Sequence, residues 1–184
     1  MEAITKLSVR KKILAINGSA GSDSANQKLI EEFSILTKND LEVIIYNDPK
    51  QLPHFDPELS VSNTPKIISD LREQIQKTDG ILISSPEYVF SIPSGLKNLI
   101  EWCVSTTVFS DKPLGIITAS ADGKKAHEEL QLIMKTVMAK FNPQTTLLIS
   151  GIKGRLNKNG EIVDPKTKEE FQKFVQAFID LFNS

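Results

Sequence analysis

The sequence has few of the residues on which disulfide, metal and nucleophilic chemistry depend. Its 184 residues include one cysteine, Cys103, and two histidines, His54 and His127. One cysteine cannot form an internal disulfide, and a lone thiol in an apolar helical stretch is typical of an inert buried group. Neither histidine has a second histidine or a cysteine nearby, so no zinc-ligand spacing exists.

An excess of charge of one sign is also absent. The formal net charge is -1, from 22 basic and 23 acidic residues, which argues against a nucleic-acid-binding surface. No apolar run is long enough to cross a bilayer, and the first 12 residues lack the apolar core of a secretion signal. We therefore expect a cytoplasmic protein, with residues 1–10 as a short tail and residues 11–184 as a single domain.

Apolar strand patterns alternate with helical patterns along the whole domain. The five expected strands span residues 13–16, 41–46, 81–85, 114–119 and 144–150. Such alternation predicts a parallel sheet with helices on both faces, joined by right-handed crossovers. Five strands fit the flavodoxin-like order 2-1-3-4-5, a three-layer α/β/α sandwich. Because ligands of such sheets bind beyond the carboxyl ends of the strands, we expect the turns after strands one, three and four to meet.

The turn after the first strand has the composition of a phosphate site. Gly18 and Gly21 permit a sharp bend and close approach of a ligand, and serines supply hydroxyl donors. Ser24 can cap the next helix, and Gln27 three residues later completes a capping-box pattern. A helix beginning here would direct unpaired N–H groups and its positive dipole end at an anion. An ordinary, well-capped strand-to-helix turn fits the same residues.

Two other phosphate-binding motifs do not match this turn. A P-loop requires a lysine after its second glycine, and no lysine occurs between Gly18 and Asn26. The dinucleotide fingerprint G-x-G-x-x-G is absent because Gly18 and Gly21 have the wrong spacing.

The turns after the third and fourth strands carry aromatic and polar side chains. Tyr88 and Phe90 offer a surface on which a flat ring, a neighbouring subunit or both could pack. Glu87 could accept a hydrogen bond from a ligand or a partner. Near the fourth strand, Ser120, Asp122 and Gly123 could donate to a polar ring edge, although Asp122 could equally cap a helix.

The helices elsewhere have recognisable starts. Thr64 and Pro65 have the pattern of a cap followed by a first helical position, and Asp164 and Pro165 repeat it. No Ser/His/Asp arrangement and no paired carboxylates occur in the expected turns. If the protein is an enzyme, a bound cofactor therefore supplies its chemistry.

Two segments resemble the motifs of one family. Residues 18–26, G-S-A-G-S-D-S-A-N, are similar to a phosphate motif G-S-x-R-x-x-S-x-N. Residues 84–102 are similar to P-E-Y-N-x-S-x-P-G-x-L-K-N-x-x-D-W, which is quite specific. Both motifs belong to the NADPH-dependent FMN reductases, the flavodoxin-like group that includes quinone and chromate reductases. The resemblance covers nearly the whole chain.

The resemblance implies an FMN-dependent enzyme that passes a hydride from NAD(P)H through flavin N5 to a quinone, flavin or similar small acceptor. It implies a homodimer or homotetramer with the flavin near a subunit interface. The charge balance, the short apolar runs and the histidine and cysteine spacing, described above, argue against a nucleic-acid partner, a membrane and a metal. Ser19, Ser24 and Asn26 would hold the phosphate, the stretch from Glu87 to Phe90 would line the isoalloxazine ring, and Ser120 would lie near the ring or ribityl chain. The full set of implied cofactor contacts is Ser19, Gly21, Ser22, Ser24, Ala25, Asn26, Pro86, Glu87, Tyr88, Val89, Phe90 and Ser120.

The chain departs from these motifs at two positions. Gly21 stands where the family has arginine, and Val89 where it has asparagine. Loss of one charge-assisted bond of about 1.5–3 kcal/mol would lower FMN affinity by roughly one to two decades. Two alternatives stay open: a degenerate binding protein with weak or no FMN, and a flavodoxin-type electron carrier. A carrier normally has a strongly acidic surface, which the net charge does not favour.

Overall fold

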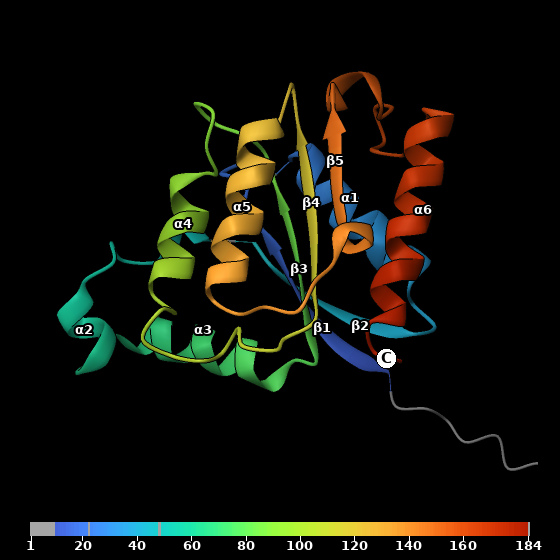
Figure 1. The fold of residues 1–184 in the computed structure, drawn as a ribbon. Coiled ribbons are helices and arrows are strands. Elements are labelled where there is room, and N and C mark those ends of the chain that lie inside the picture. The colour runs from blue at the N-terminus through green and yellow to red at the C-terminus, as the bar shows by residue number, and fades with distance from the viewer. Residues whose placement is uncertain (1–9, 22, 48, 184) are drawn as a thin grey trace, which may run out of the picture.

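A computed structural model describes residues 10–21, 23–47 and 49–183. The strands form one parallel sheet of order β2-β1-β3-β4-β5, with helices on both faces, as predicted (Figure 1). The elements are β1 (Lys11–Asn17), α1 (Ala25–Leu36), β2 (Leu41–Tyr46), η1 (Pro49–Gln51), α2 (Pro57–Val61), α3 (Lys66–Lys77), β3 (Gly80–Ser85), α4 (Ser94–Glu101), β4 (Leu114–Ser120), α5 (Lys124–Thr136), η2 (Pro143–Thr145), β5 (Thr146–Ser150), η3 (Ile152–Gly154) and α6 (Pro165–Asp180).

The central strands are buried on both faces because their apolar residues divide between two cores. In β1, Leu14 and Ile16 face one core, while Ile13 and Ala15 face the other. This is the two-residue period of a strand, and it explains why such strands read as continuous apolar runs. The carboxyl ends of all five strands consequently share one edge of the sheet.

Each face of the sheet is covered by its own helices. α3, α4 and α5 lie on one face, and α1 and α6 lie on the other (Figure 1). The aromatic stripe predicted on α6 is core packing, since Phe178 meets Phe33 of α1 edge to face with ring centroids 5.5 Å apart. In the part of the chain that the structure describes, no helix is long and apolar enough to span a membrane.

Two of the predicted helix starts are confirmed and one is wrong. Ser24 caps α1, and Asp164 caps α6 with Pro165 in its first turn. α3 instead begins at Lys66 with Pro65 in the capping position, and no side chain caps it. Thr64 is displaced from that role because its hydroxyl lies 3.5 Å from the Ser60 carbonyl. The sequence pattern around Thr64 does not reveal this contact with Ser60, which lies before the first residue of α3.

The connection between β2 and α3 is fixed to the body of the domain by its backbone. The Pro53 carbonyl accepts hydrogen bonds from Trp102 Nε1 at 2.7 Å and from Asn98 Nδ2 at 2.9 Å. Asn98 Oδ1 accepts from the Phe55 amide at 2.8 Å, and the Phe55 ring packs edge to face on Trp102. These contacts hold the connection beside α4.

Candidate functional site

The turn after β1, which we call the glycine turn (residues 18–24), begins with a close approach of two strands. The Gly18 amide donates to the Ser84 carbonyl of β3 at 2.8 Å. A Cβ atom on Gly18 would lie 2.7 Å from Ser85 Oγ, so glycine is required by space at this point. Next, the Ser19 amide donates to Asn17 Oδ1 at 3.0 Å and turns the chain away from the sheet.

The glycine turn then leads into α1 with unpaired donors. Ser24 Oγ accepts from the Gln27 amide at 3.1 Å, but the Gln27 side chain contacts Asn17 and Glu31, so the capping box is only half formed. Among the described residues, no acceptor faces the backbone N–H of Ala25 or Asn26. A helix start with free N–H groups and a positive dipole end favours an anion.

The side chain of Asn26 is buried and joins the start of α1 to two strand ends. Its Nδ2 donates to the Ala119 carbonyl of β4 at 3.1 Å, and its Oδ1 accepts from Ser84 Oγ of β3 at 3.0 Å. One of the two Nδ2 N–H groups is thus engaged, and the side chain is held in place from two strands. The predicted contact of Asn26 with the phosphate stays a prediction, and Ser22 lies outside the described residues.

The turn after β3, which we call the tethered turn (residues 87–92), is a tight hairpin. Tyr88 and Ser91 exchange two backbone hydrogen bonds of 2.9 and 3.1 Å. The two residues between them, Val89 and Phe90, have φ values of +53° and +59°. This left-handed pair is the geometry that asparagine and glycine usually provide in two-residue hairpins. A β-branched valine adopts it only under strain.

Two carboxylates fix this strained hairpin to α5. Glu87 Oε2 accepts from the Ala126 amide in the first turn of α5 at 3.0 Å. On the other side, Glu129 Oε2 accepts from Ser91 Oγ at 2.7 Å and from the Ile92 amide at 3.0 Å. The tip between the tethers stays open to solvent, with Val89 94% and Phe90 74% exposed.

The turn after β4 joins the other two, as predicted for the strand ends. Ser120 Oγ donates to the Glu87 carbonyl at 3.4 Å, and Ser19 Oγ lies 3.4 Å from the Tyr88 hydroxyl. Asp122 does not cap α5, because Gly123 occupies that position with φ of +87°. Glu87 occupies the helix start in its place.

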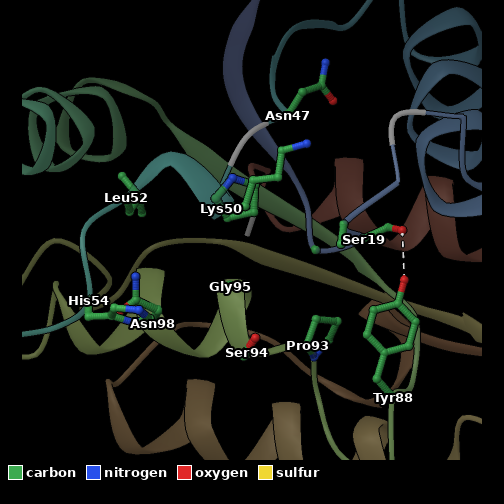
Figure 2. A pocket seen from close by; sticks show the side chains of 13 residues that line it. Ser19, Asn47, Lys50, Leu52, His54, Tyr88, Pro93, Ser94, Gly95 and Asn98 are labelled. Carbon is green, nitrogen blue, oxygen red and sulfur yellow. Dashed lines mark hydrogen bonds between the residues drawn. The ribbon is translucent and has the colours of Figure 1, made fainter.

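The cavity beside these turns is bounded differently from the prediction. It has a volume of about 260 Å³ and lies between the glycine turn, Tyr88, the start of α4 and the connection after β2 (Figure 2). Lys50 and His54 come from that connection, and Ser120 is not part of the wall. The stabilised connection after β2 therefore provides a wall that the sequence analysis did not predict, and the contact of Ser120 with FMN stays a prediction.

The ionisable groups near the site do not form a nucleophile or a metal centre. Burial raises the pKa of the Cys103 thiol to about 12, which keeps it protonated and inert, as predicted. Burial lowers the pKa of His127, whose Nδ1 lies 2.8 Å from Thr118 Oγ1. Within the described ranges, no three His, Cys, Asp or Glu side chains are grouped to hold a metal ion.

Sequence reasoning overlooked Glu129, and it assigned Glu87 no structural partner. Glu129 follows the charged, exposed Glu128 on α5, and nothing in its local sequence distinguishes it from a solvated carboxylate. Its partners are 37 and 38 residues away, beyond the reach of any local pattern. The one signal in the sequence was that Pro86 and Pro93 bound residues 87–92, which indicates a loop of fixed shape.

Comparisons with known proteins agree with this geometry. The family described as NADPH-dependent FMN reductase has a model that matches residues 11–153. An NADPH:quinone oxidoreductase from Arabidopsis thaliana is 31% identical over 97% of this chain and 96% of its own. An NAD(P)H-dependent FMN reductase from Pseudomonas aeruginosa is 29% identical over 90% and 92%. The structure of the flavoenzyme NAD(P)H:(acceptor) oxidoreductase FerB from Paracoccus denitrificans superposes with a TM-score of 0.76, at 26% identity over 94% and 97% of the two chains.

Proposed function

The chain belongs to the NADPH-dependent FMN reductase family, and from that premise we propose that its glycine turn and tethered turn hold the two ends of one FMN molecule. The observation that carries the proposal is the junction of these turns at the carboxyl edge of the sheet. There Ser19 and Tyr88 lie 3.4 Å apart, beside the cavity (Figure 2). Such an edge is where doubly wound sheets bind their ligands.

The glycine turn suits the phosphate. The hydroxyl groups of Ser19 and Ser24 are donors with fixed positions, and so are the amides of Ala25 and Asn26, which have no acceptor among the described residues. Gly21 leaves its surroundings open, since a Cβ there would meet only Ser19 Oγ, at 3.9 Å. Donors at a helix start can hold a phosphate without a cation in the turn itself, although more weakly.

The tethered turn suits the isoalloxazine ring. Among the described residues, the backbone N–H groups of Val89 and Phe90 have no partner, and both residues lie at the exposed tip of the hairpin. The ring of Tyr88, half exposed, offers an apolar surface beside them. Pro86 is buried and stiffens the base of the turn. Fixed donors at a ring edge stabilise charge that develops there during reduction.

FMN, when bound, supplies the hydride chemistry, with NAD(P)H as donor and a quinone, flavin or similar small molecule as acceptor. The role of this chain is to bind the phosphate, orient the ring and keep one face accessible. The cavity wall from Lys50 and His54 borders the space that a second reactant would enter. We assign no catalytic side chain, because FMN, when bound, would supply the hydride chemistry.

The direct test uses purified protein loaded with FMN under anaerobic conditions. Addition of NADPH should bleach the flavin absorption band within seconds, and addition of a quinone should restore it. A visible spectrum with and without FMN comes first, since protein that fails to retain FMN is the degenerate binding protein. Bound flavin that stays oxidised in NADPH, but accepts single electrons from dithionite, is the electron carrier.

We also propose that the protein is a homodimer or homotetramer in the cytoplasm. The exposed tip of the tethered turn supports self-association, because Val89 and Phe90 are large apolar side chains left adjacent on one surface. The single, buried and reduced Cys103 is consistent with a reducing compartment. Light scattering coupled to gel filtration would measure the mass, and a monomer at micromolar concentration would contradict the oligomer.

A further inference from the structure

The glycine turn carries the wrong charge for its proposed ligand. From Gly18 to Gln27 the one charged side chain is Asp23, an anion. A phosphate monoester carries about -1.5 to -2 charges at pH 7. Free amides and a helix dipole must then hold the phosphate beside a carboxylate, which repels it. A cation from outside the turn would remove that conflict.

We infer that Lys28 provides this cation, an inference that rests on the proposed function. Lys28 is four residues beyond the Ser24 cap, in the second turn of α1. Side chains on a helix lean toward its N-terminus, and Lys28 Nζ reaches back to within 3.1 Å of Asp23 Oδ1. The ammonium group is thus already at the glycine turn.

A second turn holds the stem of Lys28 in place. Gly160 has φ of +87°, and a Cβ atom there would lie 2.5 Å from Lys28 Cδ and 2.8 Å from Cγ. The backbone of that turn therefore lies directly against the lysine stem. The turn is itself closed by Asn157, whose Oδ1 accepts from the amides of Asn159 and Glu161 at 2.9 and 3.0 Å.

This covering distinguishes Lys28 from the other lysines in ion pairs. Its side chain is 27% exposed, whereas the other ion-paired lysines of the described residues are 42% to 87% exposed. Much of its rotamer freedom is already lost in the free protein. A phosphate that binds it therefore sacrifices less side-chain entropy than it would on an open surface.

The ion pair between Asp23 and Lys28 can break at little cost in stability. Asp23 is 86% exposed, and an exposed ion pair contributes little to stability. A phosphate dianion competes well for the same ammonium group, and Asp23 can turn to solvent. Asp23 thus occupies Lys28 until FMN arrives, and it lowers FMN affinity while doing so.

The experiment measures dissociation constants of FMN and riboflavin, by flavin fluorescence, for the full-length protein. Riboflavin has the same ring without the phosphate. We expect Lys28→Met to weaken FMN binding by about tenfold or more and to leave riboflavin binding unchanged. Asp23→Asn should strengthen FMN binding several-fold, and the double variant should bind better than Lys28→Met alone.

The controls separate charge at the site from general effects. Lys66→Met removes an exposed, ion-paired lysine on α3 and should change neither affinity. Lys28→Arg keeps the charge and should retain most FMN affinity. If Lys28→Met is poorly folded by circular dichroism, retention of affinity by Lys28→Arg and the gain from Asp23→Asn still test the inference. A cation placed in the turn by Gly21→Arg, where space is open, should restore FMN affinity to Lys28→Met.

The outcomes distinguish this inference from the proposed function. A wild-type protein that binds no FMN contradicts the proposed function itself. A wild type that binds FMN more tightly than riboflavin, with a Lys28→Met variant that keeps the same preference, overturns the role of Lys28 alone. Loss of FMN and riboflavin affinity in parallel would also overturn it, because a phosphate contact cannot act on riboflavin.

Discussion

The glycine turn and the tethered turn lie side by side but are built in opposite ways. The glycine turn is made by its own neighbourhood: Asn17, Ser19 and Ser24 supply most of its hydrogen bonds within ten residues. The tethered turn depends on Glu87 and on Glu129 of α5, far along the chain from the residues that it holds. One turn is fixed by local sequence, and the other is fixed by tertiary structure.

This difference matches what each end of the ligand requires. A phosphate is symmetric and charged, so a helix start with small residues is sufficient to bind it. A ring edge needs donors at fixed positions, and the tethered turn provides them at the cost of a left-handed valine. Variants of the two turns should therefore differ in which part of the ligand they affect.

The largest effect is expected where the tether is cut. Glu129→Ala removes the acceptor of Ser91 Oγ and of the Ile92 amide, so the hairpin loses one anchor. We expect a loss of about 1–2 kcal/mol in the free energy of unfolding, since hydrogen bonds to a charged, half-exposed group are involved. FMN and riboflavin affinities should fall together, in contrast to Lys28→Met. Urea unfolding and flavin titration measure both quantities.

A neighbouring substitution provides the control for this prediction. Glu128→Ala removes an exposed carboxylate from the same helix, where it pairs with Lys125 at the surface. It should change stability and both affinities very little. A Glu129→Ala variant that behaves like Glu128→Ala would show that the turn keeps its shape without the tether.

A smaller effect of opposite sign is expected at the tip. Val89→Asn replaces a β-branched residue at φ of +53° with one that tolerates the left-handed region. Stability should rise by about 1 kcal/mol, or roughly 2–4 °C in Tm for a chain of this size. Calorimetry would measure the change. Val61→Asn alters another exposed valine, 78% against 94% exposed, that has no positive φ. A gain in stability there would show that removing an exposed apolar side chain, and not relief of strain, is the cause.

The smallest effect is expected from protonation of His127, near the start of the tethering helix. Burial lowers its pKa below the ordinary 6.5, so the unfolded chain binds the proton more tightly. Its contribution to stability is present above pH 6.5 and is lost as the pH falls from 6.5 through the folded pKa. The pKa values of Asp79 and Asp164 are lowered in the folded chain, so protonation of these carboxylates reduces stability only at more acidic pH.

Urea midpoints between pH 7 and 5.5 test this expectation. The wild type should become less stable across this interval, while His127→Asn, which keeps a polar group near Thr118, should show a flatter profile. His54→Asn is the parallel control. If the two variants have the same slope as the wild type, His127 has no part in the acid sensitivity.

The fold could be predicted from the sequence because its determinants are local and periodic. Alternating apolar strands and helices fixed the sheet order, and caps such as Ser24 and Asp164 marked two helix starts. The resemblance to the family through residues 18–26 and 84–102 is confirmed by the family comparison. The assigned contacts of individual residues with FMN stay predictions.

The parts of the site that the sequence did not reveal depend on long-range contacts. The sequence did not show that the Asn26 side chain, on α1, also bonds Ser84 and Ala119 on two strands. The wall formed by Lys50 and His54 exists because Pro53 is fixed to α4, which no pattern within residues 47–63 indicates. Only the folded chain brings these groups together.

The hydrogen bond from Trp102 to Pro53 also gives the molecule an internal optical reporter. Trp102 is the one tryptophan of the chain, and it is fully buried against Phe55. Its emission therefore reports on the seating of a single segment, the connection after β2. A red shift with unchanged far-ultraviolet dichroism would reveal that this segment can lift away while the sheet stays intact, and titration with a quinone would show whether an acceptor closes it.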